Sequence, residues 1–288
     1  MSFKFNFGEA TNNEDSLTDK KSETQVITQN PLRPCKVHQC DLKCDLSSFE
    51  WSAIDVGKHT LRFVTPEFAA NNITNTEITS LITSSDLRSG EYEGGLKVWE
   101  CTFDVLDYLE EKGIGSQATV FDMGCGAGLL GLFALLEGAR SVCFQDYNSE
   151  VIESFTLPSV CSSIQHAADL KPDDGVLEGR LNFFSGDWDA VGCFLESEGF
   201  PKFDLVLSSE TIYNTEYYPK ILDFLQAHLS DTGEALFAAK THYFGVGGGT
   251  YDFVNFVTKN GNFKVSVVKK IEQGLTREIL KVCKKTVG

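Results

Sequence analysis

The chain is short of basic residues and has no long apolar run. Lys and Arg together number 25 against 41 Asp and Glu, which gives a formal net charge of −16. An acidic surface repels nucleic acid and favours a basic partner, although it also serves solubility. We therefore expect no direct nucleic-acid binding. No apolar stretch approaches the length that crosses a bilayer, so no membrane-spanning helix is expected.

No secretory signal is expected either, because residues 1–7 contain no apolar core. Nine cysteines, an odd number, are scattered through segments that are predicted as core strands and helices. These features favour reduced thiols and a cytoplasmic and nuclear location. Cys35, His38, Cys40 and Cys44 lie close together, but their spacing does not match common zinc sites, and we expect no metal.

The composition divides the chain into three segments. Residues 1–34 are largely polar and aperiodic, which predicts a disordered tail. Residues 35–90 are mixed, with Trp51 and Phe63 among the side chains able to pack on a domain, and are predicted as an N-terminal extension. Residues 91–288 alternate apolar strands with helices, a pattern typical of a doubly wound, mostly parallel sheet with helices on both faces.

Seven strands are predicted in this sheet. They are residues 118–121, 141–144, 181–185, 203–208, 235–239, 263–268 and 278–282. The run at 203–208 is unbroken and apolar, as expected of a strand that is buried on both faces. Predicted helices are residues 98–112, 129–137, 217–229 and 250–259. Gly113 is a natural C-cap for the first of them.

The most informative segment is Val120–Gly128, where an apolar strand ends at Asp122 and a loop of alternating glycines opens a helix. Glycine removes the Cβ atoms that would block a ligand, and the helix N-terminus presents free N–H groups. This pattern indicates a nucleotide-type site at the carboxyl end of the first parallel strand. The glycines also satisfy a dinucleotide fingerprint, with Asp146 about where a ribose-binding acid belongs.

Three further features favour S-adenosylmethionine over a dinucleotide. A carboxylate at Asp122 would repel a pyrophosphate but suits a cofactor that carries an ammonium and a sulfonium. An amphipathic helix follows Gly94-Gly95 and precedes the first strand, whereas dinucleotide folds usually begin at that strand. Asp187 and Trp188, after the third strand, can accept from an adenine amino group and stack beside it. A dinucleotide oxidoreductase is the alternative that the glycines alone allow.

Four motifs resemble those of the histidine protein methyltransferase family, which belongs to the seven-strand S-adenosylmethionine-dependent methyltransferases. The motifs are residues 93–102 (EGGLKVWECT), 144–148 (FQDYN), 208–214 (SSETIYN) and 242–249 (HYFGVGGG). The resemblance runs from about Leu87 to the C-terminus, and Phe-x-Phe-x-Phe at residues 3–7 is also similar. It implies a Rossmann-like class I sheet and methyl transfer from S-adenosylmethionine to a histidine imidazole nitrogen of a protein. The implied target is a large-subunit ribosomal protein, and we expect a monomeric enzyme.

The resemblance also implies a set of cofactor contacts. Trp99 would stack on the cofactor, and Asp146 would accept from both ribose hydroxyls. On residue statistics alone, Trp99 would instead be a core residue of its helix. The expected cofactor-binding residues are Val98, Trp99, Glu100, Cys101, Thr102, Asp122, Gly124, Gln145, Asp146, Tyr147, Gly186, Asp187, Trp188 and Ser209.

Glu210 and Tyr213 are the candidate catalytic residues. They follow the fourth strand, where such sheets place their sites, and on one helical turn they would share a face and grip the acceptor ring. The other interpretation is that Glu210 caps the next helix or meets a surface lysine. The alternative functions are lysine methylation, as in a neighbouring family, and a non-catalytic adaptor that keeps the fold.

A glycine-rich segment at residues 245–249 lacks the Lys-Ser/Thr ending of a phosphate-binding loop. It also comes after the fifth strand rather than the first. We therefore expect a flexible rim near the acceptor site, which would include His242 and Tyr243.

Overall fold

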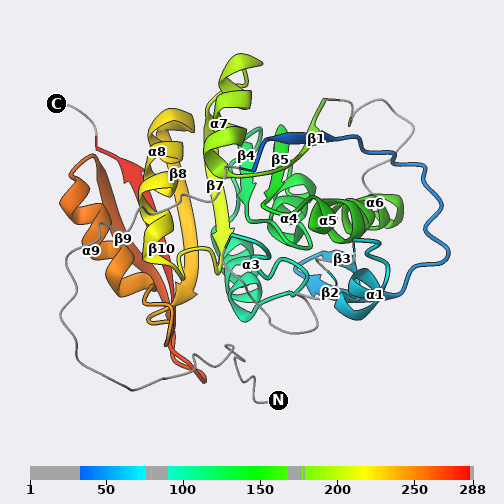
Figure 1. Ribbon diagram of the computed structural model, residues 1–288, viewed down its shortest axis with the longest axis horizontal. Coiled ribbons are helices and arrows are strands. Elements are labelled where there is room, and N and C mark those ends of the chain that lie inside the picture. Colours follow the sequence, from blue (N-terminus) through cyan, green and yellow to red (C-terminus); the bar gives the residue numbers. More distant parts are fainter. Residues whose placement is uncertain (1–32, 76–78, 80–89, 168–176, 178, 286–288) are drawn as a thin grey trace, which may run out of the picture.

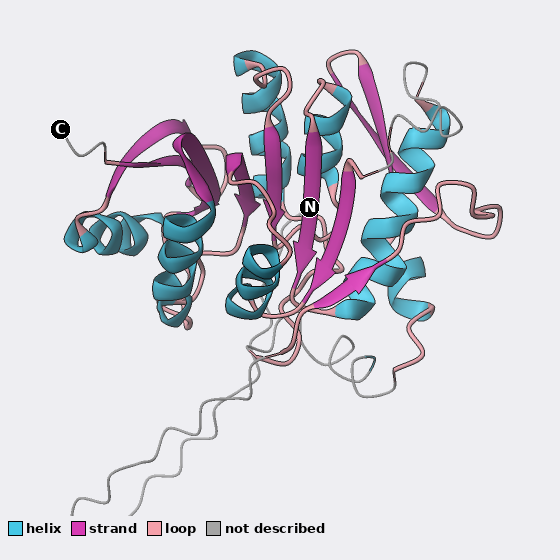
Figure 2. Cartoon of the chain, turned by 90° about the horizontal axis from the view of Figure 1, so that it is seen from above, coloured by secondary structure: helices cyan, strands magenta, loops and turns pink. Residues whose placement is uncertain are grey.

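The structure is a computed structural model that describes residues 33–75, 79, 90–167, 177 and 179–285 (Figure 1). The predicted disordered tail, residues 1–34, lies outside these ranges except for Arg33 and Pro34. One large sheet crosses the molecule and carries helices on both faces, which confirms the predicted fold class (Figure 2). In the described part of the chain, no helix is long and apolar enough to cross a membrane.

The centre of the sheet consists of five parallel strands. They are β4 (Thr119–Met123), β5 (Ser141–Asp146), β6 (Leu181–Ser185), β7 (Phe203–Ser209) and β8 (Leu229–Lys240). Beyond β8 the sheet continues as an antiparallel pair, β10 (Arg277–Lys284) and then β9 (Phe263–Ile271). All seven predicted strands are present, in the spatial order β6-β5-β4-β7-β8-β10-β9.

The expected strand count of seven is wrong, because an eighth strand joins the edge of the sheet. This strand, β1 (Lys36–His38), pairs antiparallel with β6 and places Val37 opposite Phe184. It has only three residues, two of them exposed. Its stability comes from the partner strand rather than from an apolar pattern of its own, so no periodic signal predicted it.

The segment after β1 packs against the main sheet's helices. The strands β2 (Trp51–Val56) and β3 (His59–Val64) form a hairpin, and α1 (Pro66–Asn71) follows. The backbone N–H group of Val64 donates to Ser159 Oγ at 3.0 Å. Apolar side chains of β3 belong to the same hydrophobic core as those of β4. The hairpin is therefore part of the core that supports the sheet.

The remaining helices divide between the two faces of the sheet. The core on one face contains side chains of α3 (Glu100–Lys112), α4 (Leu129–Leu136) and α6 (Leu157–His166), the last preceded by α5 (Ser149–Val151) and η1 (Ile152–Thr156). The core on the other face contains side chains of α7 (Trp188–Ser197), α8 (Tyr218–His228) and α9 (Thr250–Asn260).

The central strand shows why its sequence is apolar throughout. Val120 belongs to one core and its neighbour Phe121 to the other, because successive side chains of a strand point to opposite faces. Gly113 ends α3 as expected, with its N–H donating to Leu109 O. The helix begins at Glu100, two residues later than predicted, and the helices at residues 149–166 and 188–197 were not predicted.

Candidate active site

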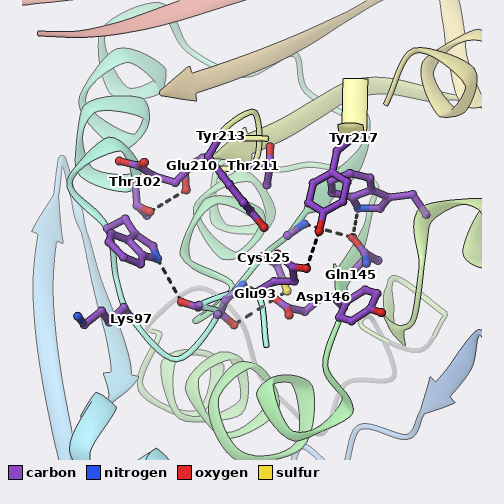
Figure 3. Close-up of a pocket in the computed structure, with 18 of the residues that line it drawn as sticks. Glu93, Lys97, Thr102, Cys125, Gln145, Asp146, Glu210, Thr211, Tyr213 and Tyr217 are labelled. Carbon is purple, nitrogen blue, oxygen red and sulfur yellow. Dashed lines mark hydrogen bonds between the residues drawn. The ribbon is translucent and has the colours of Figure 1, made fainter. Parts of the chain in front are cut away.

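The carboxyl ends of β4, β5, β6 and β7 open into a cavity of about 580 Å³ (Figure 3). Thirteen of the sixteen residues predicted for the site line it. They are Val98, Trp99, Thr102, Gly124, Gln145, Asp146, Tyr147, Gly186, Asp187, Trp188, Ser209, Glu210 and Tyr213. Glu100, Cys101 and Asp122 do not line it.

The cavity has two ends, which we name after their carboxylates. Figure 3 shows Gln145 and Asp146 on one side and Thr102 and Glu210 on the other, with the ring of Tyr213 between them. The Asp146 end comprises Gly124, Gln145, Asp146, Tyr147 and Trp188. The Glu210 end comprises Trp99, Thr102, Ser209, Glu210 and Tyr213.

The glycine loop forms the floor of the cavity. Gly124 has φ of 64°, and a Cβ built there would lie 2.6 Å from Thr211 Cγ2. A side chain at this position would therefore be strained and would collide with the β7 loop. The Gly126 N–H donates to Asp146 Oδ2 at 3.1 Å, which fixes the loop against the end of β5. The sequence pattern thus forms a cradle without side chains, as expected.

Asp122 lies beneath this cradle instead of facing the cavity. It is 1 % exposed and accepts a hydrogen bond from the N–H of Gly131, in the first turn of α4, at 2.8 Å. Burial raises the pKa of Asp122 from its ordinary 3.8 to about 8, so the protonated form predominates at pH 7. The negative charge that we expected there to attract a cationic ligand is therefore not supplied by Asp122.

Gln145 ties together three segments at the Asp146 end. Its Oε1 atom accepts from the N–H of Gly124 at 3.2 Å and from the indole N–H of Trp188 at 2.8 Å. Its Nε2 group donates to Gly186 O at 2.9 Å. The amide therefore fixes the orientation of the Trp188 ring relative to the glycine loop.

Asp146 is the acidic group closest to the floor at this end. It is 3 % exposed, and its two oxygens accept from the N–H groups of Gly126, at 3.1 Å, and Asn148, at 3.3 Å. Burial raises the pKa of Asp146 to about 6, so the carboxylate predominates at pH 7. Each carboxylate oxygen can accept a further hydrogen bond, which leaves acceptor capacity toward the cavity.

Asp187 also lines this end, but its carboxylate is already engaged. It caps α7 by accepting from the N–H of Asp189 at 3.1 Å, and Lys220 donates to its other oxygen at 2.6 Å. Lys220 lines the cavity and was not predicted. Any hydrogen bond from a ligand to Asp187 would have to share oxygens with these two partners.

Glu93 and Tyr217 also line the cavity and were not predicted as site residues. Glu93 Oε1 accepts from the Tyr217 hydroxyl at 2.8 Å and from the Gly90 N–H at 2.6 Å. Its Oε2 atom is buried and has no hydrogen-bond partner. Burial raises the pKa of Glu93. Glu93 belongs to the EGGLKVWECT motif, which was the only signal that it matters.

The late start of α3 explains which residues before β4 reach the cavity. Trp99 stands in extended conformation just before the helix, half-buried, and its indole N–H donates to Gly94 O at 3.2 Å. Thr102 meets Ser209 at 2.9 Å between hydroxyl oxygens. Glu100 instead points to Arg277, at 3.4 Å, and Cys101 is fully buried. These two residues stand behind the cavity wall.

Glu210 does not share a helical turn with Tyr213. It has φ of 58°, and the next helical segment begins only at η2 (Thr215–Tyr217). Both residues still line the cavity, because the turn after β7 presents them to the same space. A non-glycine residue in the left-handed region costs energy, and such residues cluster at functional sites.

The carboxylate of Glu210 is buried and held from behind. Tyr243 donates its hydroxyl to Oε2, and Lys240 Nζ lies 3.5 Å from Oε1. The Oε1 atom itself has no hydrogen-bond partner. Tyr243 is 5 % exposed, so it is not part of a surface rim as we expected, although His242 is exposed. The close approach of Gly248 to the backbone of Tyr213, with a hydrogen bond of 3.0 Å, brings this loop onto the site.

The N-terminal cysteines and histidine have other partners. His38 meets Ser185 at 2.8 Å, and the sulfur of Cys40 lies 3.5 Å from that of Cys161. Over the residues that the structure describes, no group of three or more His, Cys, Asp or Glu side chains could hold a metal ion.

Sequence comparisons agree with this geometry. A family model described as "Lysine methyltransferase" matches residues 80–245. The histidine protein methyltransferase 1 homolog of Rattus norvegicus is 36 % identical over 95 % of this chain and 81 % of its own length. The homolog of Bos taurus is 41 % identical, and the match covers 80 % of this chain and 64 % of the homolog. The homolog of Dictyostelium discoideum is 38 % identical, and the match covers 71 % of this chain and 62 % of the homolog. The aligned part thus spans slightly less than two thirds of the last two.

Solved structures share the fold at low identity. One described as a SAM-dependent methyltransferase from Streptococcus mutans has a TM-score of 0.53 at 11 % identity, covering 83 % of this chain and 57 % of its own. Another, SMU.776, described as a methyltransferase complexed with SAH, has a TM-score of 0.52 at 11 % identity, covering 81 % and 56 %.

The fold and the cavity define a class I methyltransferase whose methyl donor is S-adenosylmethionine. The residues present fit that cofactor, because the glycine floor leaves room for it and a buried Glu93 oxygen lacks a partner beside it. Within this class, the chain belongs to the histidine protein methyltransferase family.

Proposed function

We propose that this chain is a protein-histidine N-methyltransferase. The observation that carries the proposal is the buried Glu210 carboxylate at the cavity wall, whose Oε1 atom lacks a hydrogen-bond partner. An imidazole ring with one nitrogen at the methyl donor needs an acceptor for the N–H on its other side. Glu210 Oε1 offers one. The names of the relatives, which align over most of this chain, support the same activity.

The cofactor supplies an electrophilic methyl group when it is bound. At the Asp146 end, Asp146 would accept hydrogen bonds from its ribose, Gly124 would leave space beneath it, and Trp188, fixed by Gln145, would border the adenine. A cofactor held in this way would place its reactive end toward Ser209 and Glu210, across the cavity. Tyr213, which lies between the two ends, would then border the space of the acceptor.

The acceptor ring needs orientation more than activation. Free imidazole has a pKa of about 6.5, so its neutral, nucleophilic form already predominates at pH 7. Glu210 would fix the tautomer by accepting the remote N–H, while the methyl group leaves the sulfur of the donor as the new N–C bond forms on the facing nitrogen. The N–H proton can then leave along the same hydrogen bond. Tyr243 holds the other oxygen of Glu210, so the carboxylate cannot rotate away.

The target is a basic protein, which fits the net charge of −16. By family resemblance, we propose a large-subunit ribosomal protein, methylated by a monomeric enzyme in the cytoplasm or nucleus. Mass spectrometry of lysates from wild-type and knockout cells identifies the modified residue. The proposal requires a methylhistidine that disappears in the knockout; loss of a methyllysine instead contradicts it.

Replacement of the carboxylate tests its role directly. For Glu210→Ala we expect turnover to fall about a hundredfold, while S-adenosylhomocysteine binding, measured by calorimetry, changes less than threefold. Glu272→Ala removes an exposed glutamate from the loop between β9 and β10 and serves as the matched control. Turnover of Glu210→Ala equal to that of the control would remove Glu210 from the mechanism.

Lysine methylation is the second candidate, because the matching family model is described as "Lysine methyltransferase". Amino-acid analysis of the product separates the two, as 1- or 3-methylhistidine against methyllysine. A non-catalytic adaptor would give neither product, even though it could still bind S-adenosylhomocysteine.

A further inference from the structure

A buried lysine stands directly behind the Glu210 end of the cavity. Lys240 is the last residue of β8, and its side chain is 8 % exposed, against 5 % for that of Glu210. Its Nζ lies 3.5 Å from Glu210 Oε1, 5.5 Å from the ring centre of Trp99 and 5.3 Å from that of Tyr243. Lys240 does not line the cavity itself. It reaches the acceptor space through Glu210 and Trp99.

The ion pair cancels the charge of Glu210. Two further titratable groups face the carboxylate: the Tyr243 hydroxyl from the segment after β8 and the Cys101 thiol from α3. Burial raises the pKa of both well above the ordinary value, so both are neutral at pH 7. The Glu210 end therefore presents a polar acceptor atom with little net charge, since Lys240 balances the carboxylate.

We propose that Lys240 determines the preference for a neutral ring over an ammonium group as methyl acceptor. This inference rests on the proposed function. A lysine acceptor arrives as an ammonium, and its nitrogen gains a lone pair for the new N–C bond only after a proton has left. A carboxylate that is already paired with Lys240 attracts the ammonium weakly, because the two positive charges compete for the same group. A neutral imidazole carries no positive charge that must be attracted, and the nitrogen that receives the methyl group already has its lone pair. It therefore needs only a hydrogen-bond acceptor for its other nitrogen.

The contrast with a lone buried carboxylate shows what Lys240 changes. Without the lysine, Glu210 would be an uncompensated negative charge in a water-poor space, which favours any cation that can reach it. The acceptor space would then attract ammonium groups. Lys240 is thus a positioning and specificity residue, because it touches neither acceptor nor cofactor.

Two variants of Lys240 test this assignment. The substrates are the histidine peptide identified in the knockout comparison and the same peptide with lysine in place of the histidine. For Lys240→Met we expect the ratio of lysine to histidine turnover to rise at least tenfold, with histidine turnover itself lowered. Lys240→Arg keeps the charge and should stay within about threefold of wild type in both respects.

Two control variants separate charge from packing. The double variant Glu210→Gln, Lys240→Met is neutral at this point and should show no gain in lysine turnover. Lys269→Met breaks the ion pair between Lys269 of β9 and Glu111 of α3, outside the cavity, and should leave the ratio unchanged. An unchanged ratio in Lys240→Met, with S-adenosylhomocysteine binding intact, overturns the inference. Wild-type protein that methylates no histidine overturns the proposed function instead.

A measurement on wild-type protein decides the matter if Lys240→Met does not fold. Imidazole and n-butylammonium are titrated into the complex with S-adenosylhomocysteine at pH 7.5 and followed by ligand-observed NMR. We expect imidazole to bind at least tenfold more tightly. Equal affinity, or tighter binding of n-butylammonium, contradicts a role for Lys240 in rejecting cations.

Discussion

The two ends of the cavity are built in different ways. Each main group at the Asp146 end stands at or just after the carboxyl end of a parallel strand, so neighbouring strands bring Gly124, Asp146 and Trp188 together. The Glu210 end combines the turn after β7 with Lys240 and Tyr243 from the end of β8 and with Trp99 from the start of α3.

This difference separates what the fold itself provides from what this chain adds to it. Parallel strands place their carboxyl ends at one edge of the sheet by topology alone, so the Asp146 end follows from the fold. The Glu210 end needs a left-handed residue and a buried ion pair, neither of which the fold requires. Changes at the first end should therefore alter cofactor binding, and changes at the second should alter turnover.

The largest expected effect is at the Asp146 end. Asp146→Ala removes a charged acceptor for two hydroxyls, and bonds to charged groups are worth about 1.5–3 kcal/mol each. We expect S-adenosylhomocysteine affinity to fall at least a hundredfold by calorimetry. Asp107→Ala, at an exposed position of α3, is the control. A loss of less than tenfold would mean that Asp146 only supports the loop through Gly126.

The next effect belongs to the Glu210 end. Tyr243→Phe removes the hydroxyl that holds Glu210 Oε2, so the carboxylate can rotate. Turnover should fall about tenfold, in keeping with the modest worth of a single hydrogen bond to a charged group. Cofactor affinity should change little. Tyr251→Phe alters an exposed tyrosine and should match wild type. If Tyr243→Phe lost cofactor affinity but kept its turnover, the assignment of turnover to the Glu210 end would be contradicted.

The third effect is a pH dependence of cofactor binding. The pKa of Asp146 is raised to about 6 by burial, and its protonated form has lost part of its acceptor capacity. Lowering the pH from 7.5 to 5.5 should therefore weaken S-adenosylhomocysteine binding about fourfold. Asp146→Asn should abolish this dependence, whereas Glu93→Gln should keep it. Persistence of the dependence in Asp146→Asn would assign it to Glu93, whose pKa is also raised.

The last effect concerns stability rather than binding. The folded-state pKa of Asp122, about 8, lies above its ordinary 3.8, so its stabilising contribution is complete below pH 4 and is lost as the pH rises through 8. The Tm of wild type relative to Asp122→Asn should fall by about 5 °C between pH 6 and 8, at ~2 °C per kcal/mol. A pH-independent difference, measured by calorimetry, would contradict the buried neutral carboxyl.

The sequence predicted the Asp146 end better than the Glu210 end. Strands that are buried on both faces are continuous apolar runs, and alternating glycines permit only a few loop conformations, so both signals are local. Local signals do not predict which way the side chain of Asp122 points. A carboxyl at the end of a strand can face the ligand or the helix that follows, and only the position of the Gly131 N–H decides between them.

The Glu210 end depends on contacts between residues far apart in sequence. Lys240 and Tyr243 follow Glu210 by about 30 positions, and the pairing of β7 with β8 brings their strands together. The prediction that Glu210 and Tyr213 share a helical turn was wrong, because a left-handed residue breaks the helix there. A charged side chain at the end of an apolar strand was the one available signal for Lys240.

The eighth strand sets a lower bound on the fragment that can fold and bind. The backbone carbonyl of Arg33 accepts from the Asp187 N–H at 3.1 Å, and a Cβ on Gly186 would lie 2.5 Å from Pro34 O. The segment just before β1 thus packs behind Gly186 and Asp187, which line the cavity. The family model matches residues 80–245. A protein truncated to these residues would lack the segment before β1, the hairpin β2–β3 and the edge strands β9 and β10. Shortened versions intended for crystallisation should therefore begin upstream of residue 33.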